Sequence, residues 1–160
     1  MTEILNQEEY QFAINAAITA AKASTCARSK CGSVIVKGYE IIGIGWNSQP
    51  GSCDGVECEC FKDTIPRTFK SDRNCCVHAE QRAIMDALKH NSDKIEGSIL
   101  FFVRLDENDE AKMSGRPYCT ICSKMALDVQ ISKFVLWHNE GWTAYDTDEY
   151  NKLSFKYIED

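Results

Sequence analysis

Two short segments contain residues whose types and spacing could hold a catalytic metal ion. The first places His78 two positions before Glu80, and the second places Cys119 three positions before Cys122. One imidazole and two thiolates are typical ligands of a zinc ion that keeps its fourth position open. The Glu80 carboxylate is not needed as a ligand, so it could take a proton from an acidified water and pass it to a substrate. The segments therefore predict a zinc-dependent hydrolase in which Glu80 is the catalytic acid and base.

Each segment is expected to stand at the start of a helix. Apolar residues recur at helical spacing directly after His78, from Ala79 to Leu88. The two cysteines are three positions apart, which puts them on one side of a second helix start. A helix N-terminus carries partial positive charge, which favours a thiolate over a thiol and a neutral imidazole over an imidazolium. Both preferences assist metal binding, because the ligand atoms must be deprotonated.

Each segment also has a simpler explanation. A His-x-Glu sequence arises readily by chance in a chain with 24 acidic residues. A Cys-x-x-Cys pair alone is equally typical of a redox pair or of half a structural zinc site. A non-catalytic zinc-binding module is therefore the alternative to an enzyme. The conjunction of both segments in this order favours the enzyme, as does Glu80, because a purely structural site has no use for that carboxylate.

The rest of the chain predicts a sheet covered by helices. We expect an amphipathic helix over residues 7–24, a strand hairpin that turns at Gly38, and buried strands over residues 98–103 and 131–137. A last helix is expected around Tyr150 and Leu153. A chain of 160 residues has the length of one domain. We therefore expect a single α/β domain over residues 1–160, with its sheet covered by helices.

Four segments of the chain resemble one family. In order, they are ARSKCGSVIV, GIGWNSQPG, CVHAEQRAI and PYCTICSKMAL, and they span roughly residues 10–137. They are similar to the cytidine/deoxycytidylate deaminase superfamily, above all to its deoxycytidylate-type branch, and they contain the ligand pattern of zinc deaminases. The resemblance implies the cytidine deaminase-like fold, a three-layer α/β/α sandwich with a mixed central sheet and both motif helices on one side.

The same resemblance implies a reaction and a set of contacts. The reaction is zinc-dependent hydrolytic deamination of a cytosine-type nucleotide or nucleoside, with conversion of dCMP to dUMP favoured. The zinc ligands are His78, Cys119 and Cys122. The substrate contacts are expected to be Asn47 at the sugar, Arg28 at the phosphate, and Ala79. A homo-oligomer is expected by resemblance alone.

The chain departs from the family pattern close to the expected site. A polar loop at about residues 104–116 separates the strand from the second segment, and Tyr118 interrupts the family's Pro-Cys pair. Arg82 stands where deoxycytidylate-type relatives tend to carry Asn, either as a substrate contact or as a helix-surface charge. These departures keep other substrates open: a modified pyrimidine, a guanine-type purine, or a base within nucleic acid.

A cysteine-rich insertion at about residues 52–76 offers a second candidate metal site. Four of its cysteines could hold a structural zinc: Cys53, Cys58, Cys60 and Cys75. Some deoxycytidylate-type relatives carry an extra zinc in this region, whereas the irregular spacing equally fits free thiols. The insertion also contains basic residues that either recognise a phosphate or face solvent: Lys62, Arg67, Lys70 and Arg73.

Composition narrows the partners and the location. The formal net charge of −6 argues against broad nucleic-acid binding, which needs a basic surface, and favours a small-molecule substrate. We find no apolar run long enough to span a membrane, and the first residues lack the basic and apolar parts of a signal peptide. Because some of the nine cysteines are expected to be metal ligands, a reducing, cytoplasmic location fits best.

Overall fold

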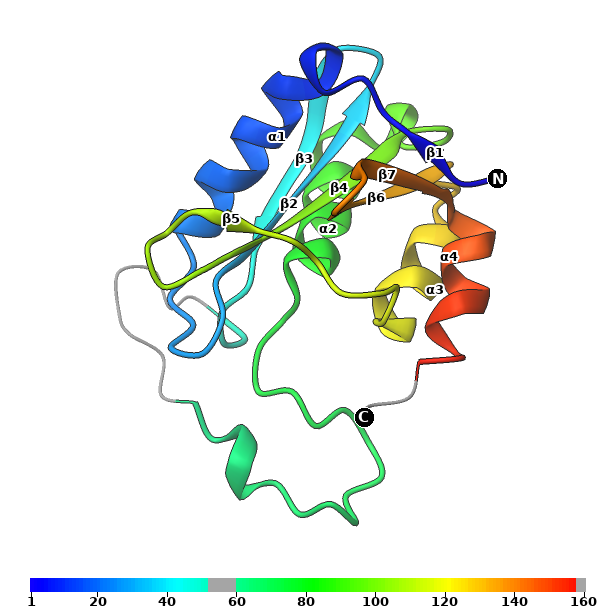
Figure 1. The fold of residues 1–160 in the computed structure, drawn as a ribbon. Coiled ribbons are helices and arrows are strands. Elements are labelled where there is room, and N and C mark those ends of the chain that lie inside the picture. The colour runs from blue at the N-terminus through cyan, green and yellow to red at the C-terminus, as the bar shows by residue number, and fades with distance from the viewer. Residues whose placement is uncertain (52–59, 158–160) are drawn as a thin grey trace.

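Seven strands form one mixed sheet in the computed structural model, which describes residues 1–51 and 60–157 (Figure 1). Six strands lie in the order β1 (Glu3–Ile4), β7 (Gly141–Asp146), β6 (Lys133–His138), β4 (Ile99–Leu105), β2 (Cys31–Lys37) and β3 (Glu40–Trp46). The seventh, β5 (Ala111–Lys112), pairs with the end of β4. The pairing of β4 with β6 is parallel, and every other pairing is antiparallel.

Helices cover both faces of this sheet. On one face lies α1 (Gln7–Lys22), and on the other lie α2 (Ala79–Asn91), α3 (Thr120–Asp128) and α4 (Thr147–Ser154) (Figure 1). Two 3-10 turns, η1 (Lys62–Thr64) and η2 (Ser92–Lys94), complete the described elements. The predicted three-layer sandwich is confirmed, with both motif helices on one side. None of the helices in the described part of the chain is long and apolar enough to span a bilayer.

The two apolar cores follow from the alternation of side chains along each central strand. In β2, Val34 and Val36 pack toward α1, whereas Ile35 packs toward α2. In β4, Phe101 lies in the core beneath α1 and Leu100 in the core beneath α2. Successive strand residues point to opposite faces, so a strand covered on both sides must be apolar throughout. This explains the apolar run that predicted β4.

Two glycines let α2 lie directly against β3. A β-carbon on Gly45 would stand 2.3 Å from the carbonyl oxygen of Ala79, and one on Gly43 would stand 2.4 Å from that of Ala83. Both distances are too short for real atoms, so larger residues would push the helix away from the strand. The close packing therefore fixes the start of α2 relative to the sheet.

Two parts of the chain differ from the expectation. Trp142 and Tyr145 lie within β7, an additional strand that follows the turn at Gly141 (φ 129°). The polar segment at 104–116 is only partly a loop, because Arg104 pairs with Lys112 across β4 and β5. The strands β5 and β7 both mix polar and apolar residues. Each is stabilised by pairing with a neighbouring strand, and the local sequence does not reveal that partner.

Candidate active site

The three predicted metal ligands converge between the starts of α2 and α3. The Nδ1 atom of His78 lies 3.2 Å from the sulfur of Cys119 and 3.2 Å from that of Cys122. Within residues 1–51 and 60–157, no other group of three His, Cys, Asp or Glu ligand atoms is as close, with all separations within 4.8 Å. Usual zinc bond lengths and tetrahedral angles set a nitrogen–sulfur separation of about 3.6 Å. The three side chains therefore fit a zinc ion after a small expansion.

Helix starts position these ligands. His78 is the residue that precedes α2, and its backbone N–H donates to the side chain of Gln81 at 3.0 Å. Cys119 precedes α3, and its sulfur accepts a hydrogen bond of 3.3 Å from the backbone N–H of Cys122. Residues that precede a helix have extended backbones, so their side chains can turn back over the exposed N–H groups of the first turn. Both predicted helix starts are thus confirmed.

Electrostatics within the ligand set favour one thiolate and one imidazolium before metal binds. A hydrogen bond from the Cys122 thiol, aided by the His78 imidazole, lowers the pKa of Cys119 to about 4. The same hydrogen bond, together with burial, raises the pKa of Cys122 well above its usual value. Burial would lower the pKa of His78, but the Cys119 thiolate and the charge of Glu80 outweigh it and raise the pKa to about 9.

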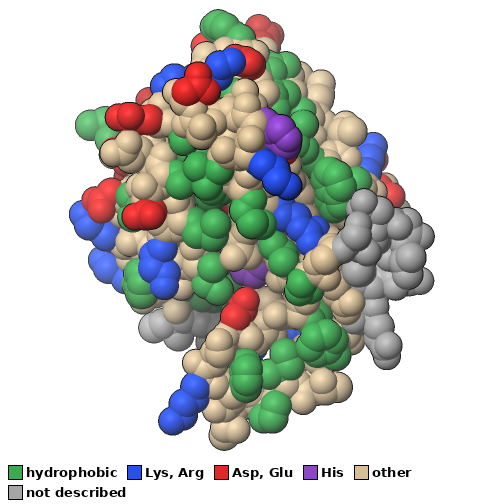
Figure 2. Space-filling model, turned by 180° about the vertical axis from the view of Figure 1, so that it is seen from behind, with side chains coloured by type: hydrophobic (Ala, Val, Ile, Leu, Met, Phe, Trp, Pro, Cys, Tyr) green, Lys and Arg blue, Asp and Glu red, His purple; other side chains and the backbone are tan. Residues whose placement is uncertain are grey.

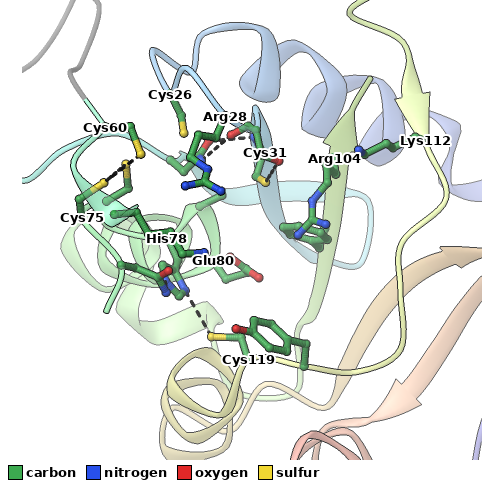
Figure 3. Close-up of a pocket in the computed structure, with 18 residues that line it drawn as sticks. Cys26, Arg28, Cys31, Cys60, Cys75, His78, Glu80, Arg104, Lys112 and Cys119 are labelled. Carbon is green, nitrogen blue, oxygen red and sulfur yellow. Dashed lines mark hydrogen bonds between the residues drawn. The ribbon is translucent and has the colours of Figure 1, made fainter. Parts of the chain in front are cut away.

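Glu80 lies beside the ligands without joining them. Its side chain is in the first turn of α2 and is 6% exposed. Burial raises the pKa of Glu80, and the Cys119 thiolate adds to the effect. The residue lines a cavity of about 390 Å³, which His78 and Cys119 also line (Figure 3). A carboxylate with a raised pKa at the wall of a cavity is suited to accept and return a proton.

The other ring nitrogen of His78 has a partner that the sequence did not indicate. The Nε2 atom of His78 lies 2.9 Å from the side-chain amide of Asn74. The facing amide atom is Nδ2, which donates to Nε2 when that ring nitrogen is unprotonated. A metal on Nδ1 leaves the ring proton on Nε2, and a half-turn of the Asn74 amide then presents its Oδ1 to accept that proton. Asn74 is therefore positioned to orient the imidazole.

Asn47 lines the same cavity, as the resemblance implied. Its Oδ1 accepts hydrogen bonds from the backbone N–H of Cys31 at 2.8 Å and from the Ser24 hydroxyl at 2.6 Å. Its Nδ2 donates to the carbonyl oxygen of Ser29 at 2.7 Å. The Asn47 oxygen and one of its two Nδ2 protons therefore hold the surrounding loops together. The other Nδ2 proton has no partner among the described residues.

The two other expected substrate contacts, Ala79 and Arg28, both line the cavity, but only Arg28 has a charged partner. Ala79 is fully buried and lines the cavity from the first position of α2. Arg28 also lines the cavity, but its half-exposed guanidinium forms an ion pair with Asp63 at 2.7 Å. Arg28 thus carries a carboxylate partner of its own.

Arg82 is neither a free surface charge nor a lining residue of the described cavities. Its guanidinium donates hydrogen bonds to the carbonyl oxygens of Trp46 and Gln49 and to the Ser48 hydroxyl. The side chain therefore ties α2 to the loop that follows β3, next to Asn47.

Arg104 lines the cavity without having been predicted. It is the next-to-last residue of β4 and points into the cavity from the side opposite His78 (Figure 3). The available signal was a charged residue within the otherwise apolar run that ends at Leu105.

The expected second metal site is only partly described. Cys53 and Cys58 lie outside the described residues. The sulfurs of Cys60 and Cys75 lie 3.7 Å apart, and that of Cys76 lies 4.0 Å from Cys75. Cys26, which was not among the predicted ligands, lines the same part of the cavity and interacts with the Cys76 thiol. None of the described cysteines forms a disulfide.

A mixed sheet between helices, with one imidazole, two thiols and a buried carboxylate at two helix starts, defines a zinc hydrolase site with an open position. Comparison with known protein families supports the assignment of a zinc site. The "Cytidine and deoxycytidylate deaminase zinc-binding region" matches residues 7–138, and the chain belongs to this family.

Individual relatives are distant. The chain is 22% identical over 134 residues to "Deoxycytidylate deaminase" of Schizosaccharomyces pombe, a match that covers 82% of this chain and 36% of that protein. The chain thus matches about a third of the length of this curated relative. It is 26% identical to dCMP deaminase from cyanophage S-TIM5 in complex with dCMP and dUMP, with a TM-score of 0.58 and 81% of each chain covered.

A third relative is similar in fold. Cytidine deaminase from Burkholderia pseudomallei is 15% identical, with a TM-score of 0.56 over 88% of this chain and 94% of that chain. The cytidine deaminase-like fold is therefore shared at low sequence identity.

Proposed function

We propose that the protein hydrolytically deaminates a cytosine-type nucleotide, with dCMP converted to dUMP and ammonia. The observation that carries this proposal is the buried Glu80 in a cavity beside His78 and Cys119. When bound, zinc supplies a Lewis acid that acidifies the attacking water. His78, Cys119 and Cys122 are the residues that would hold it.

Glu80 then performs the proton transfers. Its carboxylate takes a proton from the water, delivers it to the ring nitrogen of the pyrimidine, and passes a proton to the departing amine. Burial excludes bulk water from Glu80 and raises its pKa, so that the protonated form is accessible during the reaction. The first turn of α2 holds the carboxylate at the cavity wall.

The choice of dCMP is supported by relatives and by the site. The S. pombe relative is a deoxycytidylate deaminase, and the S-TIM5 enzyme has a structure in complex with dCMP and dUMP. In addition, the cavity is lined by cations that suit a phosphate, including Arg104 and Lys112. We propose that Asn47 and Ala79 contact the nucleoside part.

The test is ammonia release by zinc-loaded protein on cytosine, cytidine, deoxycytidine, CMP, dCMP and guanine. We expect dCMP to be the best substrate. The variant Glu80→Gln should lose about 10³-fold in kcat while keeping its zinc, because it removes a proton carrier and not a ligand. Loss of zinc together with activity would contradict the role of Glu80. Absence of turnover on every cytosine compound would overturn the proposed reaction.

We also propose a structural zinc between the cysteines of the insertion and Cys26. Tetrahedral coordination with usual zinc–sulfur bonds sets sulfur–sulfur separations of about 3.8 Å. The separations of 3.7 Å from Cys60 to Cys75 and 4.0 Å from Cys75 to Cys76 are close to that value. The sulfurs of the described cysteines here do not all lie within 4.8 Å of one another, so the outer ones would move inward on metal binding: Cys26, Cys60, Cys75 and Cys76.

Metal content tests this second site. Wild-type protein should carry about two zinc equivalents per chain, one for each proposed site, and Cys75→Ser should carry about one. Glu80→Gln is the matched control and should keep both. A single equivalent in the wild type would contradict the proposal.

The homo-oligomer and the cytoplasmic location are also proposals. The exposed apolar side chains of Met85 and Leu88 on α2 support an oligomer interface on the outer side of this helix. Figure 2 shows hydrophobic side chains gathered on one face of the molecule. Sedimentation of the wild type against Met85→Glu tests it, and a monomeric wild type would contradict it. Free thiols at both proposed metal sites favour the reducing cytoplasm.

A further inference from the structure

A second cavity opens beside the one that contains Glu80. Its volume is about 260 Å³, and it extends past Arg104 toward the segment at Ser114 and Arg116. The two cavities share several wall residues: Lys62, Glu80, Phe102, Arg104, Tyr118 and Cys119. The second cavity is therefore a side lobe of the candidate active site. We call it the Arg104 lobe.

The Arg104 lobe and its junction with the main cavity carry a concentration of positive charge. Four cations line the two cavities without forming an ion pair to any described acidic residue: Lys62, Arg104, Lys112 and Arg116. Glu80 is the one described carboxylate in either wall. In a chain of net charge −6, such clustering attracts an anion to this place.

Two polar atoms of the lobe point to a ligand. The Nε atom of Arg104 and the hydroxyl of Ser114 are buried and have no hydrogen-bond partner in the described part of the chain. Buried polar atoms are almost always paired, so a pair of unpaired ones in a cavity wall indicates a binding partner. A guanidinium and a hydroxyl both donate to phosphate oxygens.

Arg104 is held ready for such a ligand. Its guanidinium lies 5.8 Å from the centre of the Phe102 ring, which limits its rotation. Its positive charge is also felt by the carboxylate of Glu80 and the thiol of Cys31. Arg28, the cation expected from the sequence, is instead paired with Asp63 at 2.7 Å.

We infer that Arg104, assisted by Ser114 and by Lys62, Lys112 and Arg116, binds the phosphate of the nucleotide substrate and so determines its preference over the nucleoside. This inference rests on the proposed function and assigns the phosphate to a lobe that the polar segment before Cys119 builds. Arg28 contributes mainly to holding Asp63. The departure of residues 104–118 from the family pattern is thereby a substrate-binding feature.

The experiment compares binding of two products, dUMP and deoxyuridine, by isothermal titration calorimetry on the zinc-loaded protein. Products bind without turnover, so the measurement is independent of the deamination rate. In Arg104→Met, the preference for dUMP over deoxyuridine should fall about 100-fold, the size expected for a lost charge-assisted contact. Arg104→Lys should retain an intermediate preference. Ser114→Ala should reduce the preference about fivefold, as for a neutral hydrogen bond.

Lys30→Met is the matched control. It removes one positive charge, but Lys30 pairs with Asp109 and does not line either cavity. It should keep the preference for dUMP. Equal weakening of both products in Arg104→Met and Arg104→Lys would overturn the inference, as would an unchanged preference. If the wild type binds dUMP tightly through Arg104 but deaminates no cytosine compound, the proposed reaction fails while the anion lobe stands.

Discussion

Arg82, on α2, donates a hydrogen bond of 2.9 Å to the carbonyl oxygen of Gln49, in the loop that follows β3. Further bonds to Trp46 and Ser48 make the guanidinium a clamp on this loop. Asn47 lies between these residues, with its amide at the cavity. Arg82 does not line the cavity, but it fixes the loop that holds Asn47, which does.

The variant Arg82→Ala should impair substrate binding indirectly. Loss of the clamp releases the loop, so KM should rise about tenfold while zinc content stays unchanged. Arg82→Lys should recover only part of the loss, because one ammonium cannot reach several carbonyl oxygens at once. Steady-state kinetics and metal analysis provide the measurement. A fall in kcat at unchanged KM would contradict this positioning role.

Removal of the partner of the His78 ring should weaken zinc binding. In Asn74→Ala, the Nε2 proton of His78 loses its acceptor and the ring its fixed orientation, so zinc affinity should fall about 10- to 100-fold. Competition with a chromophoric chelator measures the affinity. Asn74→Asp, which keeps an acceptor, is the control and should bind zinc at least as tightly as the wild type. An unchanged affinity in Asn74→Ala would mean that the ring is oriented by other groups.

Zinc binding should release protons and strengthen as pH rises. Between the pKa of Cys119 at about 4 and that of His78 at about 9, the metal-free site contains a thiolate and an imidazolium. The raised pKa of Cys122 keeps this thiol protonated. Zinc requires all three ligands deprotonated, so about two protons leave per ion at neutral pH.

The release has a defined dependence on pH. Because protons compete with the metal, zinc affinity should increase about 100-fold per pH unit from pH 6 to 8. Calorimetry in buffers of different ionisation enthalpy counts the protons directly. Affinity that does not change over this range would refute the charge state assigned to the ligands.

A methyl group at Gly45 should destabilise the fold and the site together. The β-carbon of alanine would stand 2.3 Å from the Ala79 carbonyl oxygen, so α2 must move away from β3. Overpacking of this kind costs about 1–3 kcal/mol. The melting temperature should fall, and zinc affinity with it, because His78 immediately precedes the displaced helix. Gly115→Ala is the control, since nothing lies within 4 Å of its added carbon; similar melting temperatures for both variants would contradict the steric argument.

The sequence predicted the elements that follow local rules. Apolar periodicity located α2, and continuous apolar runs located β4 and β6, because burial on both faces leaves a direct pattern. The ligand set could be predicted because metal chemistry restricts residue type and spacing. The strand β7 could not, since pairing with β6 stabilises it and a local reading does not include that partner.

The residues around the ligands were harder to predict for a related reason. Arg104 and Asn74 are brought to the cavity by segments far from each other in the chain, and only the sheet register and the helix start place them. Arg28 was expected at the phosphate, but the sequence could not indicate that Asp63, 35 positions away, would engage it. An ion pair between residues far apart in the chain forms only in the folded structure, so it leaves no local pattern in the sequence.

The hydrolytic centre and most of the cation cluster belong to different parts of the architecture. His78 and Cys119 precede helices that are packed against the sheet, and Arg104 lies on the central strand β4. Lys62, Lys112 and Arg116 instead lie on exposed outer segments. Exchange of the outer segments could therefore admit a different nucleotide while the proposed hydrolytic chemistry stays intact.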